Sequence, residues 1–275
     1  MQAMKSKVAV VTGGRRGIGR AIVVALAHDG WDTVVIDMVD DESTQHTLRL
    51  AEDAGRRAAF IRWDIAEAGR AVELCERAVA VFGYVDCLVN NAGVQVIDRT
   101  VDVLDTSLPS FDRLVNINLR GTFFLTQAFA RYMVEDSTPR GTPRSIITIS
   151  SSNATHAKTK GAEYCLSKAG VAMMTKLMAL RLAPYDVACY DLQPGLIKTA
   201  LNESMHSVYE PVVSAGLTPM PRWGLPEDVG QTVATLAGGG LRFCTGQSLF
   251  IDGGLHIPKS PFESPFVQAA ISGDQ

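Results

Sequence analysis

Tyr164 and Lys168 place a phenol and an ammonium group four residues apart. The surrounding sequence is typical of a helix, and residues at positions i and i+4 share one helix face. A lysine beside a tyrosine favours the phenolate and so lowers the pKa of the phenol. A phenol with a pKa nearer neutrality can exchange a proton with an alcohol or a carbonyl oxygen. The pair therefore indicates acid–base chemistry, although two unrelated surface side chains would give the same pattern.

A glycine-rich turn at residues 12–19 gives a second chemical signal, because it lies between an apolar run at 8–11 and a helical pattern at 17–27. Gly13, Gly17 and Gly19 remove side chains where the backbone must approach a pyrophosphate or pack closely on a sheet. The following helix would direct its N-terminal N–H groups at the anion. The spacing is GxxxGxG and not the commoner GxGxxG, and a glycine-rich loop without a ligand is the alternative.

Asp37 supports a nucleotide ligand. It follows Gly19 by eighteen residues, at the end of an apolar run at 33–36. A carboxylate there accepts hydrogen bonds from a ribose 2′- and 3′-hydroxyl, and it would repel a 2′-phosphate. Arg16 favours the opposite choice, since a guanidinium can pair with a 2′-phosphate, but it can also turn into solvent. We therefore predict NAD as the cofactor in preference to NADP.

Elements that could position these groups recur along the whole chain. Continuous apolar runs alternate with helical patterns, which predicts a parallel sheet covered on both faces. The expected strands are at 8–11, 33–36, 58–61, 87–89, 145–149, 187–190 and 249–251, and the longer helical patterns are at 17–27, 71–81, 111–134 and 164–183.

Two segments depart from this alternation. Residues 201–221 are polar and irregular and hold Pro211, Pro219 and Pro221. We expect them to form an excursion on the substrate side and not a domain boundary. Residues 255–275 are also rich in proline and are expected to form a C-terminal tail, either an arm or a partly disordered segment.

The composition excludes several classes of protein. The chain has 275 residues, of which 47% are hydrophobic and 20% charged, and its formal net charge is −3. This fits one globular domain, and the mild acidity argues against a nucleic-acid binder. No apolar run approaches a membrane span, and the start shows no signal peptide. The five cysteines have no CxxC spacing and the five histidines no ligand spacing, so we expect a reducing, cytoplasmic location and no metal.

Together these motifs resemble those of the short-chain dehydrogenase/reductase family, and the likeness covers residues 7 to about 255. The resemblance implies an α/β, Rossmann-type, doubly wound parallel sheet flanked by helices, in a single dinucleotide-binding catalytic domain over residues 1–275. It also implies which residues hold the cofactor. They are Gly13, Arg16, Gly17, Ile18, Gly19, Asp37, Asp64, Ile65, Asn91, Ala92, Gly93, Tyr164, Lys168, Pro194, Gly195, Ile197 and Thr199.

The resemblance further implies the catalytic roles. Ser151, thirteen residues before Tyr164, would bind and orient the substrate oxygen, and Tyr164 would exchange its proton. Lys168 would lower the pKa of the tyrosine and hold the nicotinamide ribose, while Asn118 would anchor a water that links Lys168 to solvent. Glu163, beside Tyr164, is unusual for the family and would add a negative charge near the catalytic face.

The loop after the fifth expected strand bears on the substrate, because it carries polar side chains and two lysines that could equally point to solvent. It favours a sugar, a polyol or a hydroxy acid. One alternative is NADPH-dependent reduction of a 3-oxoacyl thioester, of the acyl-carrier-protein type. A cofactor-binding regulatory protein is the non-enzyme alternative, which the intact catalytic set disfavours. The candidate substrate residues are Gln95, Ser151, Asn153 and His156.

The expected activity is therefore that of an NAD(P)-dependent oxidoreductase acting on CH–OH groups. Its partner would be a small-molecule substrate, with no nucleic acid and no membrane. The helices expected at 111–134 and 164–183 are long and rich in apolar residues, so we expect them to supply core and subunit contacts. The family resemblance implies a homotetramer or a homodimer built on such helices.

Overall fold

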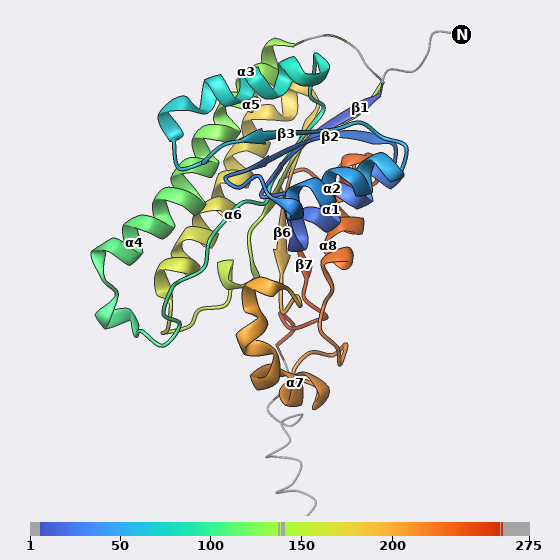
Figure 1. Cartoon of the computed structure of the whole chain (residues 1–275). Coiled ribbons are helices and arrows are strands. Elements are labelled where there is room, and N and C mark those ends of the chain that lie inside the picture. The colour runs from blue at the N-terminus through green and yellow to red at the C-terminus, as the bar shows by residue number, and fades with distance from the viewer. Residues whose placement is uncertain (1–5, 137, 139–140, 259, 261–275) are drawn as a thin grey trace, which may run out of the picture.

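The computed structural model describes residues 6–136, 138, 141–258 and 260. Seven parallel strands form one sheet in the order β3-β2-β1-β4-β5-β6-β7 (Figure 1). The chain therefore winds outward from β1 in one direction and returns through β4 in the other, which confirms the doubly wound sheet. The strands are β1 (Lys7–Thr12), β2 (Trp31–Asp37), β3 (Ala58–Arg62), β4 (Cys87–Asn90), β5 (Arg144–Ile149), β6 (Val187–Pro194) and β7 (Ser248–Ile251).

Helices cover both faces of the sheet, which explains why its central strands are apolar on both sides. Val8 and Val10 of β1 pack into one core with α3 (Ala71–Phe82), α5 (Thr122–Glu135) and α6 (Ala162–Leu182). Ala9 and Val11, which point the other way, pack into a second core with α1 (Gly17–His28) and α8 (Pro226–Ala237). The helix α2 (Glu42–Asp53) lies beside α1 (Figure 1).

The segment expected as one helix at 111–134 consists of three parts. It begins with α4 (Leu108–Leu114), continues as a π-helical turn over Val115–Gly121, and ends as α5. π-helical turns are rare and frequently lie at functional sites. Gly121 lets this turn approach the loop after β3, because a Cβ at that position would lie 2.3 Å from the carbonyl oxygen of Ile65.

The remaining helices are short or lie beyond the C-terminal ends of the strands. Residues 201–221 contain most of a 3₁₀ segment (Ala200–Met205) and α7 (His206–Ser214), which projects below the sheet in Figure 1. The expected tail at 255–275 lies almost entirely outside the described residues.

None of the helices that the structure describes is long and apolar enough to cross a membrane. Other 3₁₀ turns are Ala68–Arg70, Val103–Asp105, Ser152–Ala154 and Ala183–Tyr185.

Candidate active site

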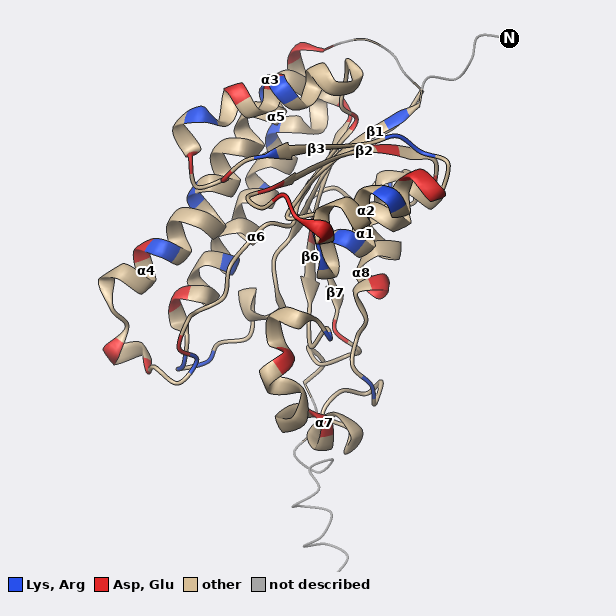
Figure 2. Ribbon diagram, viewed as in Figure 1, with Lys and Arg blue, Asp and Glu red and all other residues tan. Residues whose placement is uncertain are grey.

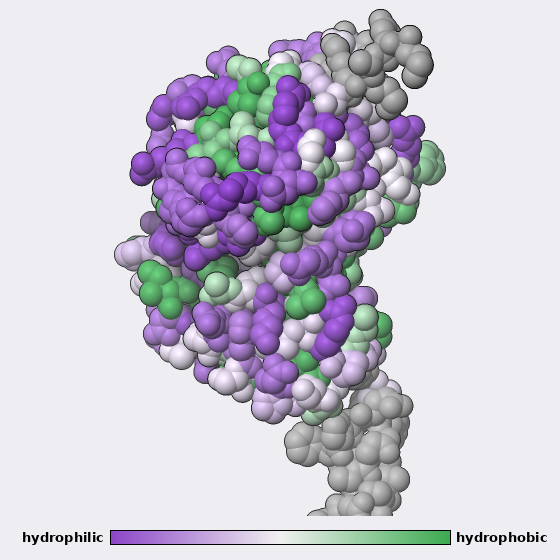
Figure 3. Space-filling view, turned by 45° about the vertical axis from the view of Figure 1, so that its right-hand side comes forward, coloured by the Kyte–Doolittle hydropathy of each residue, from purple (hydrophilic) through white to green (hydrophobic). Residues whose placement is uncertain are grey.

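A cavity of about 760 Å³ lies at the C-terminal ends of the strands. This is where ligands bind in doubly wound α/β sheets, beside the point at which the strand order reverses. In Figure 3 the surface is indented between the larger body of the molecule and the part that carries α7. The cavity extends from Asp37 and the glycine-rich turn at one end to Ser151 and Tyr164 at the other.

The glycine-rich turn is packed tightly at two positions and open at the third. A Cβ on Gly13 would lie 2.9 Å from the Cα of Ala92, and one on Gly19 would lie 2.0 Å from the carbonyl oxygen of Gly13. Gly17 has a φ of +56°, and a Cβ there would meet nothing closer than Thr199, 3.8 Å away. The helix α1 begins at Gly17 without a side-chain cap, so its first N–H groups can bind an anion in the cavity.

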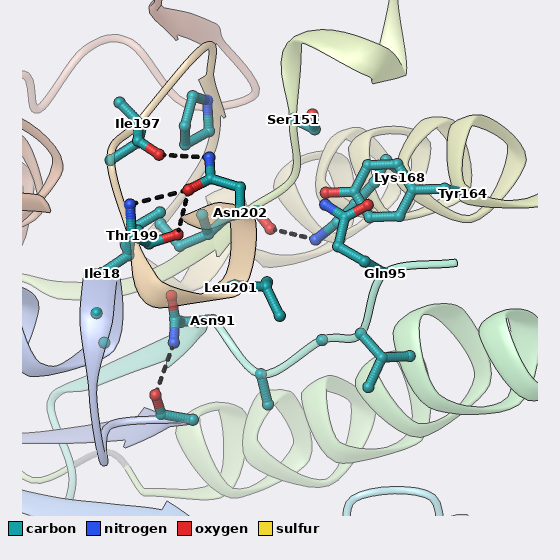
Figure 4. A pocket seen from close by; sticks show the side chains of 18 of the residues that line it. Ile18, Asn91, Gln95, Ser151, Tyr164, Lys168, Ile197, Thr199, Leu201 and Asn202 are labelled. Carbon is teal, nitrogen blue, oxygen red and sulfur yellow. Dashed lines mark hydrogen bonds between the residues drawn. The ribbon is translucent and has the colours of Figure 1, made fainter. Parts of the chain in front are cut away.

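The turn after β4 holds the glycine-rich turn in place (Figure 4). Asn91 Nδ2 donates to the carbonyl oxygens of Thr12 and Gly13, over 2.9 and 3.0 Å. In return, Thr12 Oγ1 accepts hydrogen bonds from the backbone N–H groups of Asn91 and Ala92, both at 3.0 Å. This reciprocal arrangement explains why an Asn-Asn-Ala-Gly turn accompanies the glycine-rich turn in the sequence.

The charges at this end differ from the expectation in one respect. The sequence sets Arg16 against Asp37, but Arg16 is exposed and its neighbour Arg15 contacts the acids. Arg15 Nη1 bonds to Asp41, and Arg15 Nε lies 3.7 Å from Asp37 Oδ1. Sequence reasoning missed Arg15 because its partner Asp41 caps the start of α2, and a contact between two separate elements has no signal in residue spacing.

Asp64 and Ile65, expected at the adenine, also line the cavity. Asp64 Oδ1 accepts a hydrogen bond of 2.9 Å from the backbone N–H of Ala66, which leaves its second oxygen for a ligand. Every cofactor-binding residue that we expected from the sequence lines this one cavity.

At the other end of the cavity, Tyr164 and Lys168 lie on one face of α6, as their spacing predicts. Lys168 Nζ donates a hydrogen bond of 2.9 Å to the carbonyl oxygen of Ile149, at the end of β5. Burial of the ammonium group lowers the pKa of Lys168 to about 8, against the opposing influence of the negative charge of Asp191. Asp191 is fully buried on β6 and accepts hydrogen bonds from Gln193 and Ser248.

The pKa of Tyr164 does not follow our expectation. Burial raises it, and this effect exceeds the lowering by hydrogen bonds with Ser151 and Gln95 and by the positive charge of Arg99. The cation that lowers the pKa of the phenol is Arg99, while Lys168 Nζ donates to the Ile149 carbonyl oxygen and lies 5.8 Å from the centroid of the ring. The tyrosine is therefore protonated at neutral pH.

Asn118 lies in the π-helical turn and is buried. Its Oδ1 accepts a hydrogen bond of 2.8 Å from the backbone N–H of Val94, and its Nδ2 donates to the Val94 carbonyl oxygen over 3.0 Å. Nδ2 also donates to Ser167 Oγ on α6, over 3.1 Å. Asn118 thus ties the loop after β4 to the helix that carries Tyr164. Its predicted role in a water relay stays a prediction.

Comparisons with known proteins agree with this arrangement. A family model described as enoyl-(acyl carrier protein) reductase matches residues 13–256. The crystal structure of a 3-oxoacyl-[acyl-carrier protein] reductase from Brucella melitensis, in complex with NAD, has a TM-score of 0.89 and 39% identity, and the match covers 93% of this chain and 99% of that one.

Two characterised relatives are similar over nearly their whole length. L-rhamnose 1-dehydrogenase (NAD(P)(+)) from Sphingomonas sp. strain SKA58 is 30% identical over 262 residues, which are 94% of this chain and 99% of the relative. The 2-dehydro-3-deoxy-D-gluconate 5-dehydrogenase of Escherichia coli strain K12 is 31% identical over 255 residues, which are 92% and 96% of the two chains. This chain belongs to the short-chain dehydrogenase/reductase family. Membership confirms the predicted enzyme class, an oxidoreductase.

In this family member, Ser151 Oγ lies at the start of a 3₁₀ turn and accepts hydrogen bonds from Asn153, 3.1 Å from its backbone N–H and 3.4 Å from its Nδ2. Gln95 lies beside Tyr164 and Lys168 in Figure 4. The four candidate substrate residues therefore line the same end of the cavity. His156 is among them, and its Nδ1 is buried with no hydrogen-bond partner.

Glu163 does not place its charge in the cavity. Its side chain is 3% exposed, and its Oε1 accepts a hydrogen bond of 2.6 Å from Ser110 Oγ on α4. The unusual acidic residue therefore joins α4 to the first turn of α6, beside Tyr164 in the chain but outside the cavity lining. Its effect on the charge of the catalytic face stays a prediction.

Asn202 is a site residue that sequence reasoning missed. Its Nδ2 donates to the Ile197 carbonyl oxygen over 2.8 Å, and its Oδ1 accepts from Thr199 N and Oγ1 over 3.0 and 3.1 Å (Figure 4). It holds the loop after β6 over the cavity. The spacing Thr199-x-x-Asn202 resembles a helix capping box, so a signal was present in the sequence.

The wall opposite the strands is aromatic, and we did not predict it. Trp223 and Tyr209 both line the cavity, with ring centroids 6.3 Å apart. Trp223 Nε1 donates to Glu210 over 2.9 Å, which fixes the indole. Tyr209 comes from α7, so the excursion at 201–221 contributes to the cavity. In the part of the chain that the structure describes, no cluster of three His, Cys, Asp or Glu could hold a metal.

Proposed function

We propose that this enzyme transfers a hydride between NAD(H) and a polar secondary alcohol or ketone, such as a sugar, a polyol or a hydroxy acid. The observation that carries the proposal is one cavity with a glycine-rich turn and Asp37 at one end and Ser151, Tyr164 and Lys168 at the other. A dinucleotide can span these two ends, with its reactive ring beside the phenol.

The residues present fit a nicotinamide dinucleotide. Gly17 leaves open space at the uncapped N-terminus of α1, where a pyrophosphate would bind. Asp37 would accept the ribose hydroxyls, and Thr199 and Ile197 would contact the nicotinamide end. When bound, the nicotinamide supplies or accepts the hydride. The preference for NAD over NADP rests on Asp37, since Arg15 is already paired with acids and Arg16 is exposed.

The protein groups would move the proton. Ser151 would hold the substrate oxygen beside the phenol of Tyr164. Because burial keeps this phenol protonated at neutral pH, it can donate a proton to a carbonyl oxygen during reduction. Oxidation of an alcohol needs the phenolate, so its rate should increase with pH. Lys168 would contact the nicotinamide ribose while Ile149 orients its ammonium group.

Polar residues support a polar substrate. Gln95, Asn153 and His156 line the cavity beside Tyr164, and a polar group left unpaired in a buried site costs about 1–3 kcal/mol. The two relatives named above are a rhamnose dehydrogenase and a deoxygluconate dehydrogenase, which agrees with a sugar or sugar acid here.

A second function has its own supporting observation. Apolar and aromatic side chains of the segment between β6 and α8 line the far wall of the cavity, namely Leu201, Met205, Tyr209, Leu217 and Trp223. This wall suits an acyl chain, and the Brucella relative is named a 3-oxoacyl-[acyl-carrier protein] reductase. Reduction of a 3-oxoacyl thioester is therefore the competing proposal.

We also propose a homotetramer or homodimer in the cytoplasm. The helix α6 exposes large apolar side chains along one side, with Leu166, Met173, Leu177 and Leu180 between 54% and 80% exposed. Their spacing places them on a common stripe, which a second copy of the chain could cover. The mass of the particle in solution, measured by light scattering, tests this.

The decisive experiment is a substrate panel assayed with both NAD and NADP. Sugars, polyols, hydroxy acids and 3-oxoacyl thioesters would be compared by kcat/KM. We expect the polar alcohols to react with NAD. If acetoacetyl thioesters are turned over far faster than any sugar, polyol or hydroxy acid, the polar-substrate proposal is wrong and the second function replaces it.

A further inference from the structure

Two cations at the catalytic end of the cavity take no part in the steps described above. Arg99 lies on the loop after β4 and is half-buried, and Lys158 lies on the loop after β5 and is exposed. Both line the cavity. Lys158 Nζ lies 5.7 Å from the ring centroid of Tyr164, and the charge of Arg99 is close enough to act on the Tyr164 phenol.

The two loops are joined, so the two cations lie at the same mouth of the cavity. Asp102 and Lys160 form an antiparallel bridge, and the Gly161 backbone N–H donates to the Val101 carbonyl oxygen over 3.2 Å. A Cβ on Gly161 would lie 3.4 Å from Val96 and 3.9 Å from Lys158 Cε. In Figure 2, blue and red segments lie together where these loops approach the start of α6.

Neither cation has an acidic partner among the residues that the structure describes. The nearby acids form other contacts, since Asp98 accepts hydrogen bonds from Thr100 and Glu163 Oε1 accepts one from Ser110. Asp37 and Asp64, the acidic residues that line the cavity, belong to its other end. The catalytic end therefore presents two cations that form no ion pair within the described chain.

A third polar residue lines the same cavity, namely His156. Its Nδ1 is buried and has no hydrogen-bond partner. Buried polar atoms are nearly always paired, so this nitrogen has hydrogen-bonding capacity that the described chain leaves unused.

We propose that Arg99 and Lys158 bind a carboxylate of the substrate, so that the enzyme acts on a hydroxy acid or the matching oxo acid. This rests on the proposed function and narrows it from polar alcohols to acids. Because both cations line the end of the cavity that holds Tyr164, the carboxylate and the reacting carbon would lie on neighbouring parts of the substrate. Guanidinium groups bind carboxylates through two parallel hydrogen bonds, and the lysine adds a second charge.

The test uses pairs of compounds that differ only in the acid group. D-Gluconate and D-sorbitol are one pair, and shorter hydroxy acids with the corresponding diols provide others. The wild type should prefer the acid of a pair, and added salt should raise KM for the acid while leaving KM for the neutral compound unchanged. Arg99→Ala and Lys158→Ala should each raise KM for the acid by roughly 10- to 100-fold, a larger change than either makes in KM for the neutral compound. Arg99→Ala should also shift the pH profile of kcat to higher pH for both compounds, because the charge of Arg99 lowers the pKa of Tyr164.

Matched controls separate a binding role from damage to the fold. Lys160→Ala removes a lysine two residues from Lys158 that does not line the cavity, and it should leave all constants unchanged. Arg99→Lys should restore part of the affinity for the acid. NADH binding, measured by fluorescence, should be the same in every variant.

The outcomes distinguish failure of the carboxylate assignment from failure of the proposed function on which it rests. If polyols or sugars react with NAD but no acid is preferred, or if both cation variants lose acid and neutral substrates equally, the carboxylate assignment is wrong and the proposed function stands. Faster turnover of sorbitol 6-phosphate or of a 3-oxoacyl carrier protein would assign the cations to a phosphate or to an acidic protein, and would overturn the carboxylate. If none of these compounds reacts, the proposed function fails and the carboxylate assignment with it.

Discussion

Basic side chains are paired with acids at one end of the cavity and unpaired at the other. At the cofactor end, Arg15 is paired with Asp41 and approaches Asp37. At the catalytic end, Arg99 and Lys158 line the cavity without an acidic partner in the described chain. A cation paired within the protein helps to hold an element in place, here the start of α2 against the glycine-rich turn. An unpaired cation at a cavity wall is available to a ligand, so the charged groups that would select the substrate lie at the catalytic end.

The two ends of the cavity also differ in how firmly their backbone segments are held. The glycine-rich turn is fixed by close packing against Ala92 and by the hydrogen bonds of Asn91. The loops that carry Arg99 and Lys158 are joined by one antiparallel bridge between Asp102 and Lys160. Changes at the cofactor end should therefore affect all substrates alike, whereas changes at the catalytic end should depend on the compound.

The largest effect is expected from Tyr164→Phe, which removes the hydroxyl that exchanges the proton. General acid–base groups contribute roughly 10²- to 10⁴-fold, so kcat should decrease by about that factor for every substrate. NADH binding, followed by fluorescence titration, should survive because the ring remains. A variant that turns over within a few-fold of the wild type would remove Tyr164 from the mechanism.

Asp37→Ala tests the cofactor end alone. It removes the acceptor for the ribose hydroxyls and the repulsion of a 2′-phosphate, so the preference for NAD over NADP should narrow by roughly 10- to 100-fold. Dissociation constants for NADH and NADPH measure the change, and the ratio of acid to neutral substrates should stay constant. Tighter binding of NADPH than NADH by the wild type would show that the basic residues of the turn decide the preference.

The pH dependence of stability isolates Lys168. Its pKa in the folded protein is about 8, below the ordinary value of 10.5. Between these values the unfolded chain binds the proton and the folded protein does not, so Lys168 alone should raise the free energy of unfolding by about 1–2 kcal/mol between pH 8 and 9.5. Burial raises the pKa of the Cys75, Cys87 and Cys189 thiols to about 12, which acts in the opposite direction over the same range. The contribution of Lys168 is therefore the difference between the wild type and Lys168→Met, measured by urea unfolding at both pH values, and an equal pH dependence in the two proteins would contradict it.

The smallest effect is expected from Asn202→Ala. Loss of its hydrogen bonds to Ile197 and Thr199 should loosen the loop over the cavity and raise KM for NADH by roughly 3- to 10-fold. Thr199→Val provides the matched comparison, because it removes one of these bonds and keeps the amide of Asn202. An unchanged KM in both variants would mean that the loop is held by other contacts.

The sequence was sufficient for those parts of the fold that depend on local pattern. Continuous apolar runs gave all seven strands, since a parallel sheet covered on both faces needs apolar residues on both sides. The spacing of Tyr164 and Lys168 gave their common helix face, and the cofactor residues named from motifs line one cavity.

What the sequence did not give depends on elements that meet only in the folded chain. The partner of Arg15 lies at the start of α2, and the positive charge that lowers the pKa of the phenol comes from Arg99, on a different loop. The raised pKa of Tyr164 follows from burial, which spacing does not report. The π-helical turn at Val115–Gly121 also had no signal, because its apolar pattern resembles that of a regular helix.

That π-helical turn has a consequence for how this chain could change during evolution. It holds one residue more than a regular α-helical turn would need, so deleting one residue there would make a continuous helix and rotate α4 by about 100° relative to α5. Ser110 would leave Glu163, and Asn118 would lose its place between Val94 and Ser167. We therefore expect related enzymes with the same site to differ in this segment by substitution and not by insertion or deletion.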